Sequence, residues 1–326
     1  MARDREPIAE ALGDDEDLYD VATWSPRTLT DHVAVRLDAG LRSNGERLLV
    51  ALAALLLVAQ LAIGGFVFFR APALSLLTVV SVVPALALAA AIWYLDPTGH
   101  APVGLLAVTF VLGVLFAGFA AVVDTFLFQV FRLIPVVGFL LLFFLAVGPI
   151  EETVKWLAVR VHAFRRPAFS SVVDGMVYGA VAGLGFATVE NTIYITHQFL
   201  IAAGTGGTGG PVRAAVSVAA ARAFVGPGHV LYAAISGYYL GLAKFNPDRA
   251  GPIVVKGLLL AALAHATYDT IVTYSGVSGL TFVVFIALFD GAVLWYLARK
   301  LRRYRRRYAE AMAVAAAPPR PDLERR

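Results

Sequence analysis

The feature that most constrains this chain is a succession of long apolar stretches joined by short, more polar segments. Eight of them reach the roughly 20 residues that a helix needs to cross a bilayer. They lie at Leu48–Phe69, Ala73–Leu95, Val103–Val123, Leu133–Val161, Val172–Leu200, Val212–Leu242, Ile253–Tyr274 and Leu280–Ala298. The pattern predicts an all-α, polytopic transmembrane helical bundle with about eight spanning helices. Pro149 in the fourth stretch and Pro227 in the sixth predict kinks in those helices.

Composition supports this prediction and excludes some chemistry. Only 15% of the residues are charged, compared with about 25% in a soluble domain. The charges gather at the two ends and in the loops, as expected where a bilayer makes buried charge costly. The chain has no cysteine, which excludes disulfides, thiolate nucleophiles and cysteine-ligated zinc. Residues 1–20 are acidic and polar, so we do not expect a signal peptide there.

The apolar stretches divide the chain into five regions. Residues 1–47 form a polar N-terminal tail, which we expect to be cytosolic and mostly disordered or surface-lying. Residues 48–132 hold three N-terminal transmembrane helices, and residues 133–275 hold a core of four spans. Residues 276–307 combine the eighth span with a basic juxtamembrane segment. Residues 308–326 are predicted to be a disordered C-terminal tail.

The distribution of basic residues sets the expected orientation. One side carries most of them: Arg36, Arg42, Arg47, Arg160, Arg165, Arg166, Lys244, Arg249, Lys256, Arg299, Lys300, Arg302, Arg303, Arg305, Arg306 and Arg307. The other side carries Arg70, Arg132 and Arg213. Because cytoplasmic loops are rich in Lys and Arg, this predicts a multi-pass cell-membrane protein with both termini cytoplasmic. The C-terminal basic run is expected to contact anionic lipid of the bilayer rather than nucleic acid.

Ionisable residues inside the predicted spans are candidates for function, because a buried charge is costly in a membrane. The polar candidates are Glu151, Glu152, Lys155, Glu190, Asn191, His229, His265 and Asp269. Counting from each boundary places one group from each of four consecutive spans near the midplane: Glu151, Glu190, His229 and His265. This shared depth predicts one polar cavity. Asp124, Asp174 and Asp290 are expected to be structural residues at helix ends or interfaces.

Helical spacing indicates how these groups could work. Lys155 follows Glu151 by four residues and Glu152 by three, so it can pair with either carboxylate on one face. Two neighbouring carboxylates in a low dielectric cannot both ionise easily, and a lysine beside one of them separates an acid from a base. His265 and Asp269 are also four residues apart, so the carboxylate can orient the imidazole.

Less specific interpretations remain open. The glutamates and Lys155 could form a structural ion pair, Glu190 a packing hydrogen bond, and His265 with Asp269 a structural pair. Buried acids, histidines and broken helices also suit a proton- or ion-coupled transporter, although the chain shows no repeated halves. A non-catalytic membrane scaffold is a further alternative. Peptide cleavage by the purified protein in liposomes would indicate an enzyme, and ion flux would indicate a transporter.

Three motifs on successive predicted spans give a specific resemblance. Glu151-Glu152-Thr153-Val154-Lys155 matches EExxK, Phe186-Ala187-Thr188-Val189-Glu190 matches FxxxE, and His265-Ala266-Thr267-Tyr268-Asp269 matches HxxxD. His229 stands on the span between the last two motifs. In this order the chain resembles the PrsW family of intramembrane proteases, which is related to the CAAX-prenyl endopeptidases and to the Aph-1 subunit of γ-secretase. The resemblance covers about residues 133–274.

The resemblance implies an intramembrane endopeptidase that hydrolyses peptide bonds of membrane-associated proteins, with the glutamate pair activating water. Its catalytic residues would be Glu151, Glu152, Glu190, His229, His265 and Asp269, supported by Lys155 and Asn191. Members are named metalloproteases, whereas a metal-free glutamate mechanism is argued for the relatives, so both mechanisms remain open. A divalent metal such as zinc would take Glu190, His229 and His265 as ligands. The implied partner is a membrane-protein substrate, for example a single-span regulator of the anti-sigma-factor kind.

Overall fold

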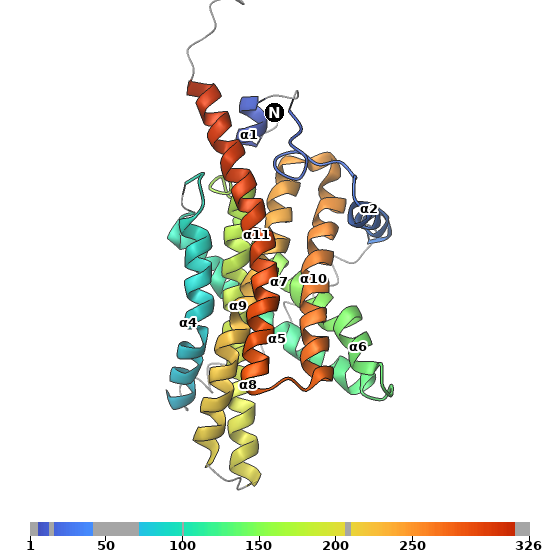
Figure 1. Ribbon diagram of the computed structural model, residues 1–326, viewed down its shortest axis with the longest axis vertical. Helices are drawn as coiled ribbons and strands as arrows, with labels where there is room; N and C mark the ends of the chain where they lie inside the picture. Colours follow the sequence, from blue (N-terminus) through green and yellow to red (C-terminus); the bar gives the residue numbers. More distant parts are fainter. Residues whose placement is uncertain (1–5, 13–15, 42–71, 100, 206–209, 317–326) are drawn as a thin grey trace, which may run out of the picture.

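The computed structural model describes residues 6–12, 16–41, 72–99, 101–205 and 210–316. Within these ranges the chain is helical, and its only β-type pairing is a single bridge between Tyr19 and Thr23. Six helices of the described ranges are long and apolar enough to cross a membrane: α4 (Pro72–Tyr94), α5 (Val103–Phe131), α8 (Val172–Thr205), α9 (Gly210–Phe245), α10 (Ala250–Ser275) and α11 (Gly279–Ala316). Figure 1 shows them side by side in an elongated bundle. The predicted all-α transmembrane bundle is confirmed.

The predicted spans correspond to these helices in order, with two exceptions. The first, Leu48–Phe69, lies outside the described residues. The fourth, Leu133–Val161, consists of three consecutive pieces: α6 (Gly138–Leu142), a π-helical turn (Phe143–Val147) and α7 (Gly148–Arg160). These pieces follow one another without a break, so together they are about 34 Å long at 1.5 Å per residue. That length is enough to cross the apolar part of a bilayer.

Proline accounts for the π-helical turn. Pro149 has no N–H, and in a regular α-helix its ring would crowd the carbonyl four residues earlier. The N–H of Gly148 bonds instead to the carbonyl of Phe143, five residues earlier, which widens the helix just before the proline. Pro149 therefore stands in the first turn of α7, where its missing N–H costs little. Glu151 follows in the same turn, so the widened segment sets the direction of its side chain.

The helix α8 is the most buried of the six, and it packs on α9 through backbone contact. A Cβ atom added at Gly179 would collide with the carbonyl oxygen of Ala233, and one at Gly183 with that of His229. Small residues at four-residue spacing let two helices approach this closely in a membrane. The seam between α8 and α9 thereby fixes the height of His229 against α8.

The N-terminal region packs into the bundle. Ile8, Leu18 and Val21 are buried, while α1 (Pro7–Leu12) lies on α11 and α2 (Leu29–Leu41) lies on α10 (Figure 1). The expectation of a disordered or surface-lying tail is therefore wrong for residues 6–12 and 16–41. That expectation rested on the average polarity of this region. The average does not show that single apolar residues are buried or that the acidic residues between them pair with lysines of the bundle.

Among the charged residues that join this region to the bundle, four form one cluster that we call the N-terminal clamp: Asp20, Asp31, Lys256 and Lys300. Lys256 Nζ lies 2.6 Å from Asp31 Oδ1 and 3.5 Å from Asp20 Oδ1, and Lys300 pairs with Asp20. Tyr19 donates its hydroxyl to Asp31 Oδ2 at 2.6 Å. The clamp ties residues in and just before α2 to α10 and α11, which follow more than 200 residues later in the chain.

The helix α11 continues to Ala316, well past the predicted end of the span at Ala298. The predicted disorder is thus wrong for residues 308–316, and residues 317–326 lie outside the described residues. Tyr304 and Ala311 are buried, so contacts hold this alanine-rich extension as a helix. In Figure 1, α1 and the C-terminal end of α11 lie at one end of the bundle. The C-terminal end of α8 and the N-terminal end of α9 lie at the opposite end.

Candidate active site

A cavity of about 770 Å³ lies among α5, the α6–α7 segment, α8, α9, α10 and α11. Its wall is largely apolar and includes Phe128, Phe139, Phe143, Val218, Val272 and Phe282. Five of the predicted residues line it: Glu151, Glu190, His229 and His265, for which a shared depth was predicted, and Asp269. The remaining three, Glu152, Lys155 and Asn191, are buried behind this lining. The four helices named by the sequence therefore meet at one place.

The two adjacent glutamates have different surroundings. Glu152 is fully buried, and its Oε1 accepts hydrogen bonds from Lys155 Nζ at 2.7 Å and from His265 Nδ1 at 3.0 Å. Glu151 lines the cavity, and its Oε2 lies at a looser 3.4 Å from the same ammonium. Glu152 is therefore held by two donors, whereas Glu151 is open to a molecule that enters the cavity.

His265 on α10 is oriented by Glu152. Because Nδ1 donates to that carboxylate, the second nitrogen, Nε2, is left facing the cavity. It lies 3.6 Å from Glu151 Oε2 and 3.5 Å from Asp269 Oδ2. The ring also stacks on Tyr232, with 5.4 Å between the ring centroids. The spacing in the sequence predicted Asp269 as the orienting carboxylate, but the closer contact comes from Glu152, 113 residues earlier.

His229 on α9 is engaged at both nitrogens. Lys155 Nζ lies 3.1 Å from Nδ1, and an ammonium can only donate, so Nδ1 accepts and the ring proton sits on Nε2. Nε2 then donates to Glu190 Oε2 at 2.5 Å. Glu190 also accepts a bond from Arg222 Nη2 at 2.8 Å. The Nδ1 edge of His229 therefore contacts Lys155, and its Nε2 edge contacts the ion pair that Glu190 of α8 forms with Arg222 of α9.

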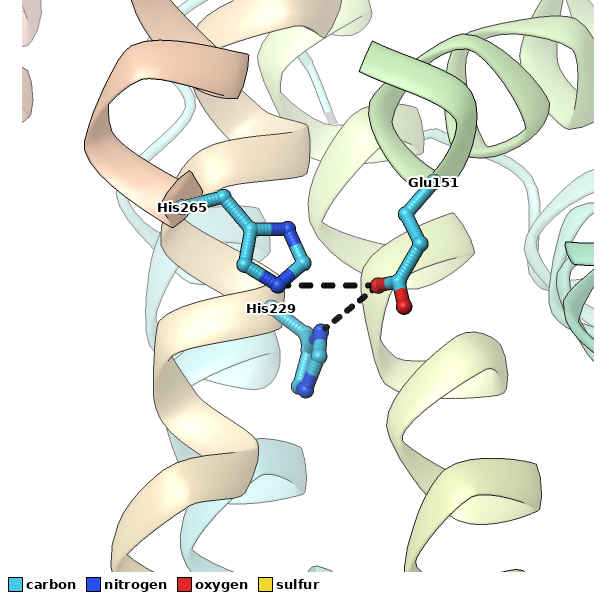
Figure 2. Close-up of side chains that lie close together, drawn as sticks. All are labelled: Glu151, His229 and His265. Carbon is cyan, nitrogen blue, oxygen red and sulfur yellow. Dashed lines mark ion pairs between the residues drawn. The ribbon is translucent and has the colours of Figure 1, made fainter. Parts of the chain in front are cut away.

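Three of these side chains form a possible metal site. Figure 2 shows Glu151, His229 and His265 pointing toward one another from α7, α9 and α10, and each offers a ligand atom within 4.8 Å of the others. Two imidazoles and a carboxylate are a common donor set for catalytic zinc, and His265 has its other nitrogen on a carboxylate, as metal-bound histidines usually do. The donor set therefore fits a divalent metal. His229 and His265 were predicted as ligands and belong to this site. Glu151 takes the place of the third predicted ligand, Glu190, whose carboxylate pairs with Arg222.

Arg222 is the main residue that the sequence interpretation missed. Its side chain is buried on α9, where Nε donates to Asn191 Oδ1 at 2.8 Å. Asn191 in turn donates to Ser81 Oγ on α4 at 2.9 Å. The signal was present in the sequence, because Arg222 is an ionisable residue inside the sixth predicted span. It precedes His229 by seven residues, which is two helical turns along the same face.

The three aspartates that were expected to be structural lie in different surroundings. Asp174 caps α8, since its Oδ2 accepts the N–H of Ser171 at 2.8 Å while its own N–H bonds to the Ser171 hydroxyl at 3.2 Å. Asp124 instead lines the cavity. Asp290 accepts a long bond of 3.4 Å from Tyr232, which itself lines the cavity. Only Asp174 has the helix-end role that was expected.

Comparison with known proteins agrees with this geometry. The sequence profile described as "PrsW family intramembrane metalloprotease" matches residues 101–306, which is more than half of the chain. The chain belongs to the PrsW family of intramembrane metalloproteases. The PrsW match extends on both sides of the region that carries the motifs, from before α5 to the basic part of α11.

Curated PrsW proteins are similar to much of the chain. "Protease PrsW" of Bacillus subtilis is 30% identical over 168 residues, which are 50% of this chain and 66% of that protein. "Protease PrsW" of Halalkalibacterium halodurans is 33% identical over 199 residues, or 60% and 83%. The Shouchella clausii protein of the same name is 32% identical over 48% of this chain and 63% of its own. The chain thus spans just under two thirds of the Bacillus subtilis and Shouchella clausii relatives.

No solved structure matches the chain significantly. The predicted PrsW family is confirmed, and these matches give the transporter alternative no support. The family and the apolar helices together make this an integral membrane protein.

Proposed function

We propose that this chain is an intramembrane endopeptidase in which Glu151 takes a proton from the water that attacks a peptide bond. One observation carries the proposal: of the two adjacent glutamates, Glu151 opens onto the cavity, with the cavity-facing nitrogen of His265 3.6 Å away. A base beside a partly enclosed water site is the first requirement of amide hydrolysis.

The surrounding residues have complementary tasks in this mechanism. Glu151 accepts the proton of the water and, facing the same cavity, returns it to the leaving amine. Glu152 holds His265 in place through the bond to Nδ1, and Lys155 offsets the negative charge of both carboxylates. The role of base, which the sequence left between the two glutamates, therefore falls to Glu151, and Glu152 becomes a positioning residue.

One carboxylate oxygen of Glu151, with His229 and His265, would hold a divalent metal such as zinc, and the other oxygen would remain to accept the proton. The metal, when bound, would supply positive charge that polarises a carbonyl and favours loss of a proton from water. In the structure Lys155 occupies Nδ1 of His229 at 3.1 Å. Its ammonium and a cation therefore compete for the same nitrogen. Metal content of the purified protein, with and without Lys155→Met, measures that competition directly.

The walls of the cavity indicate the substrate. Aromatic and aliphatic side chains surround the polar centre, so apolar residues beside the cleaved bond are favoured, as in a transmembrane segment of another protein. A single-span membrane regulator is the simplest such substrate. The basic residues of α11 at the same end as α1 support a cytoplasmic location for both termini, with residues 133–275 as the catalytic core.

The test is cleavage of a membrane-tethered reporter by purified, folded protein in lipid nanodiscs. Glu151→Gln keeps the shape of the side chain and removes its basicity, so turnover should fall by at least about a hundredfold. Glu310→Gln is the matched control, because Glu310 is an exposed residue of α11 that pairs with two arginines of its own helix. Near-wild-type turnover by the Glu151→Gln variant would overturn the proposal. Chelator treatment of the wild type, followed by zinc, shows whether a metal takes part.

A further inference from the structure

Arg222 places a guanidinium in the wall of the cavity, and the water activation proposed above does not use it. It is held from three sides. Nε donates to Asn191 and Nη2 to Glu190, each at 2.8 Å, and the guanidinium carbon lies 4.6 Å from the centre of the Tyr194 ring. Asn191 is anchored further to Ser81 on α4. A side chain fixed this firmly points its remaining donors in a set direction.

Those remaining donors have no acceptor in the part of the chain that the structure describes. A guanidinium carries five N–H groups, and Asn191 and Glu190 take one each. Arg222 Nη2 also lies 3.4 Å from His229 Nε2, but that nitrogen donates to Glu190 and cannot accept. Both N–H groups of Nη1 are therefore available. Since the side chain is buried and lines the cavity, an acceptor that enters the cavity is the natural partner.

The position of Arg222 relative to Glu151 narrows what that acceptor is. The His229 ring has Glu151 Oε2 4.0 Å from its Nδ1, and Arg222 Nη2 3.4 Å from its Nε2. The base and the guanidinium therefore flank one imidazole and line one cavity. A peptide bond lying across this ring would present its carbon to a water beside Glu151 and its oxygen to Arg222.

We propose that Arg222 donates to the carbonyl oxygen of the peptide bond that is cleaved and stabilises the negative charge that forms there; this inference rests on the proposed endopeptidase function. As the water oxygen bonds to the carbonyl carbon, its proton passes to Glu151, and the C=O π electrons move onto the oxygen that Arg222 holds. When the C–O double bond re-forms, the C–N bond breaks and Glu151 returns the proton to the amine. His265 cannot fill this role through its Nδ1–H, because that N–H donates to Glu152.

A purely structural role as the partner of Glu190 predicts different behaviour, because a lost ion pair lowers stability whether or not substrate is present. Arg222→Ala should lower kcat by about a hundredfold or more, the usual cost of removing an oxyanion donor, while KM changes little. In the Glu151→Gln background, Arg222→Ala should leave the Kd for the substrate peptide unchanged, since the oxygen becomes charged only during attack. Methylguanidinium added to Arg222→Ala should restore part of kcat. Arg213→Ala, an exposed arginine earlier on α9, is the control.

Each result decides something. Weaker peptide binding with unchanged kcat, or a loss of activity that tracks a lower Tm and is not rescued by methylguanidinium, would assign Arg222 to structure and overturn the inference. If Arg222→Ala does not fold, Arg222→Lys keeps a charge beside Glu190 but loses the planar donor edge. A wild-type kcat for Arg222→Lys then counts against the inference, and a large loss at an unchanged Tm supports it. If Glu151→Gln is inactive while both Arg222 variants cleave normally, only this inference fails; if wild type and Glu151→Gln behave alike, the protease function fails first.

Discussion

Two buried charge clusters lie in this bundle, and they differ in how completely their members are paired. In the N-terminal clamp, Lys256 and Lys300 each pair with an aspartate, and Tyr19 adds a hydrogen bond to Asp31. At the cavity, Glu151 and the Nε2 of His265 lie 3.6 Å apart, too far for a good hydrogen bond, and both face open space.

The difference shows which buried charges serve function. A complete buried ion pair adds little net stability, because removing water from both charges uses up most of the attraction that they gain, but removing one partner leaves a buried charge unpaired. The clamp closes on itself and connects segments distant in sequence. The cavity cluster keeps lone pairs and N–H groups turned toward a ligand. The clamp variants should therefore change stability and spare turnover, and the cavity variants should do the reverse.

The largest expected effect comes from His265→Ala. Loss of the imidazole removes both the partner of Glu152 and the nitrogen facing Glu151, so turnover should fall by at least about a hundredfold. Metal content should fall with it if a metal is bound. His197→Ala, at an exposed position of α8, is the control. If a folded His265→Ala protein has the turnover and metal content of the wild type, the cavity cluster is no more important for activity than the clamp, and the prediction is wrong.

Asp31→Asn should give the next largest effect, on stability. Asparagine can still cap α2, but the charge that pairs with Lys256 is lost, which should lower the free energy of unfolding by about 2 kcal/mol. Thermal unfolding in detergent measures this, and turnover per folded molecule should not change. Asp17→Asn removes an exposed pair with Arg27 and should lower the stability far less, because water screens that pair. Lost turnover without lost stability would mean that the clamp acts on the active site.

The pH dependence of stability tests the same aspartate. Burial by itself would raise the pKa of Asp31, but hydrogen bonds from Lys256, Tyr19 and the N–H groups of Arg27 and Thr28 outweigh it and hold this pKa well below its usual range. A depressed pKa contributes stability that is complete above the unfolded-state pKa of about 4 and is lost as the pH falls through the folded-state value. Wild-type protein should therefore lose stability below about pH 4, and Asp31→Asn should lose less.

The smallest effect is expected for Asp269→Asn. Asp269 Oδ2 lies 3.5 Å from His265 Nε2, so it orients the ring more weakly than Glu152 does. Asparagine keeps the shape of the side chain, and turnover should fall by about tenfold, equal to roughly 1.4 kcal/mol. The measurement is kcat for the same membrane-tethered reporter. A loss of kcat as large as that of His265→Ala would indicate that Asp269 contacts the reacting groups and is not only a positioning residue.

Hydropathy carried much of the fold. Most predicted spans begin and end within a few residues of the observed helices, because a bilayer demands a long apolar run, which a single sequence displays directly. The helices α5 and α11 continue further than predicted. Depth counting also brought Glu151, Glu190, His229 and His265 into one cavity. Arg222 could have been found by the same rule, since it is a charge inside a predicted span.

Other features depend on contacts that no local pattern contains. The choice between Glu151 and Glu152 depends on the π-helical turn before Pro149, because neighbouring residues on a helix point about 100° apart and the turn sets which one faces the cavity. The bond from His265 to Glu152 joins positions 113 residues apart. The clamp joins Asp20 to Lys300 across almost the whole chain. The amino-acid composition predicted a polar tail for the segment that holds Asp20 and Asp31, because an average polarity does not show that these acids pair with lysines of the bundle.

The seam between α8 and α9 limits how this sequence can drift over generations. At Gly183 even alanine, the smallest possible replacement, would press a methyl group against the carbonyl of His229. Few amino acids are acceptable there, whereas Phe128 and Val272 in the cavity wall can change size without moving a backbone. Variation should therefore accumulate in the wall and spare the seam. Relatives could come to prefer different substrates while the histidine stays in the same place.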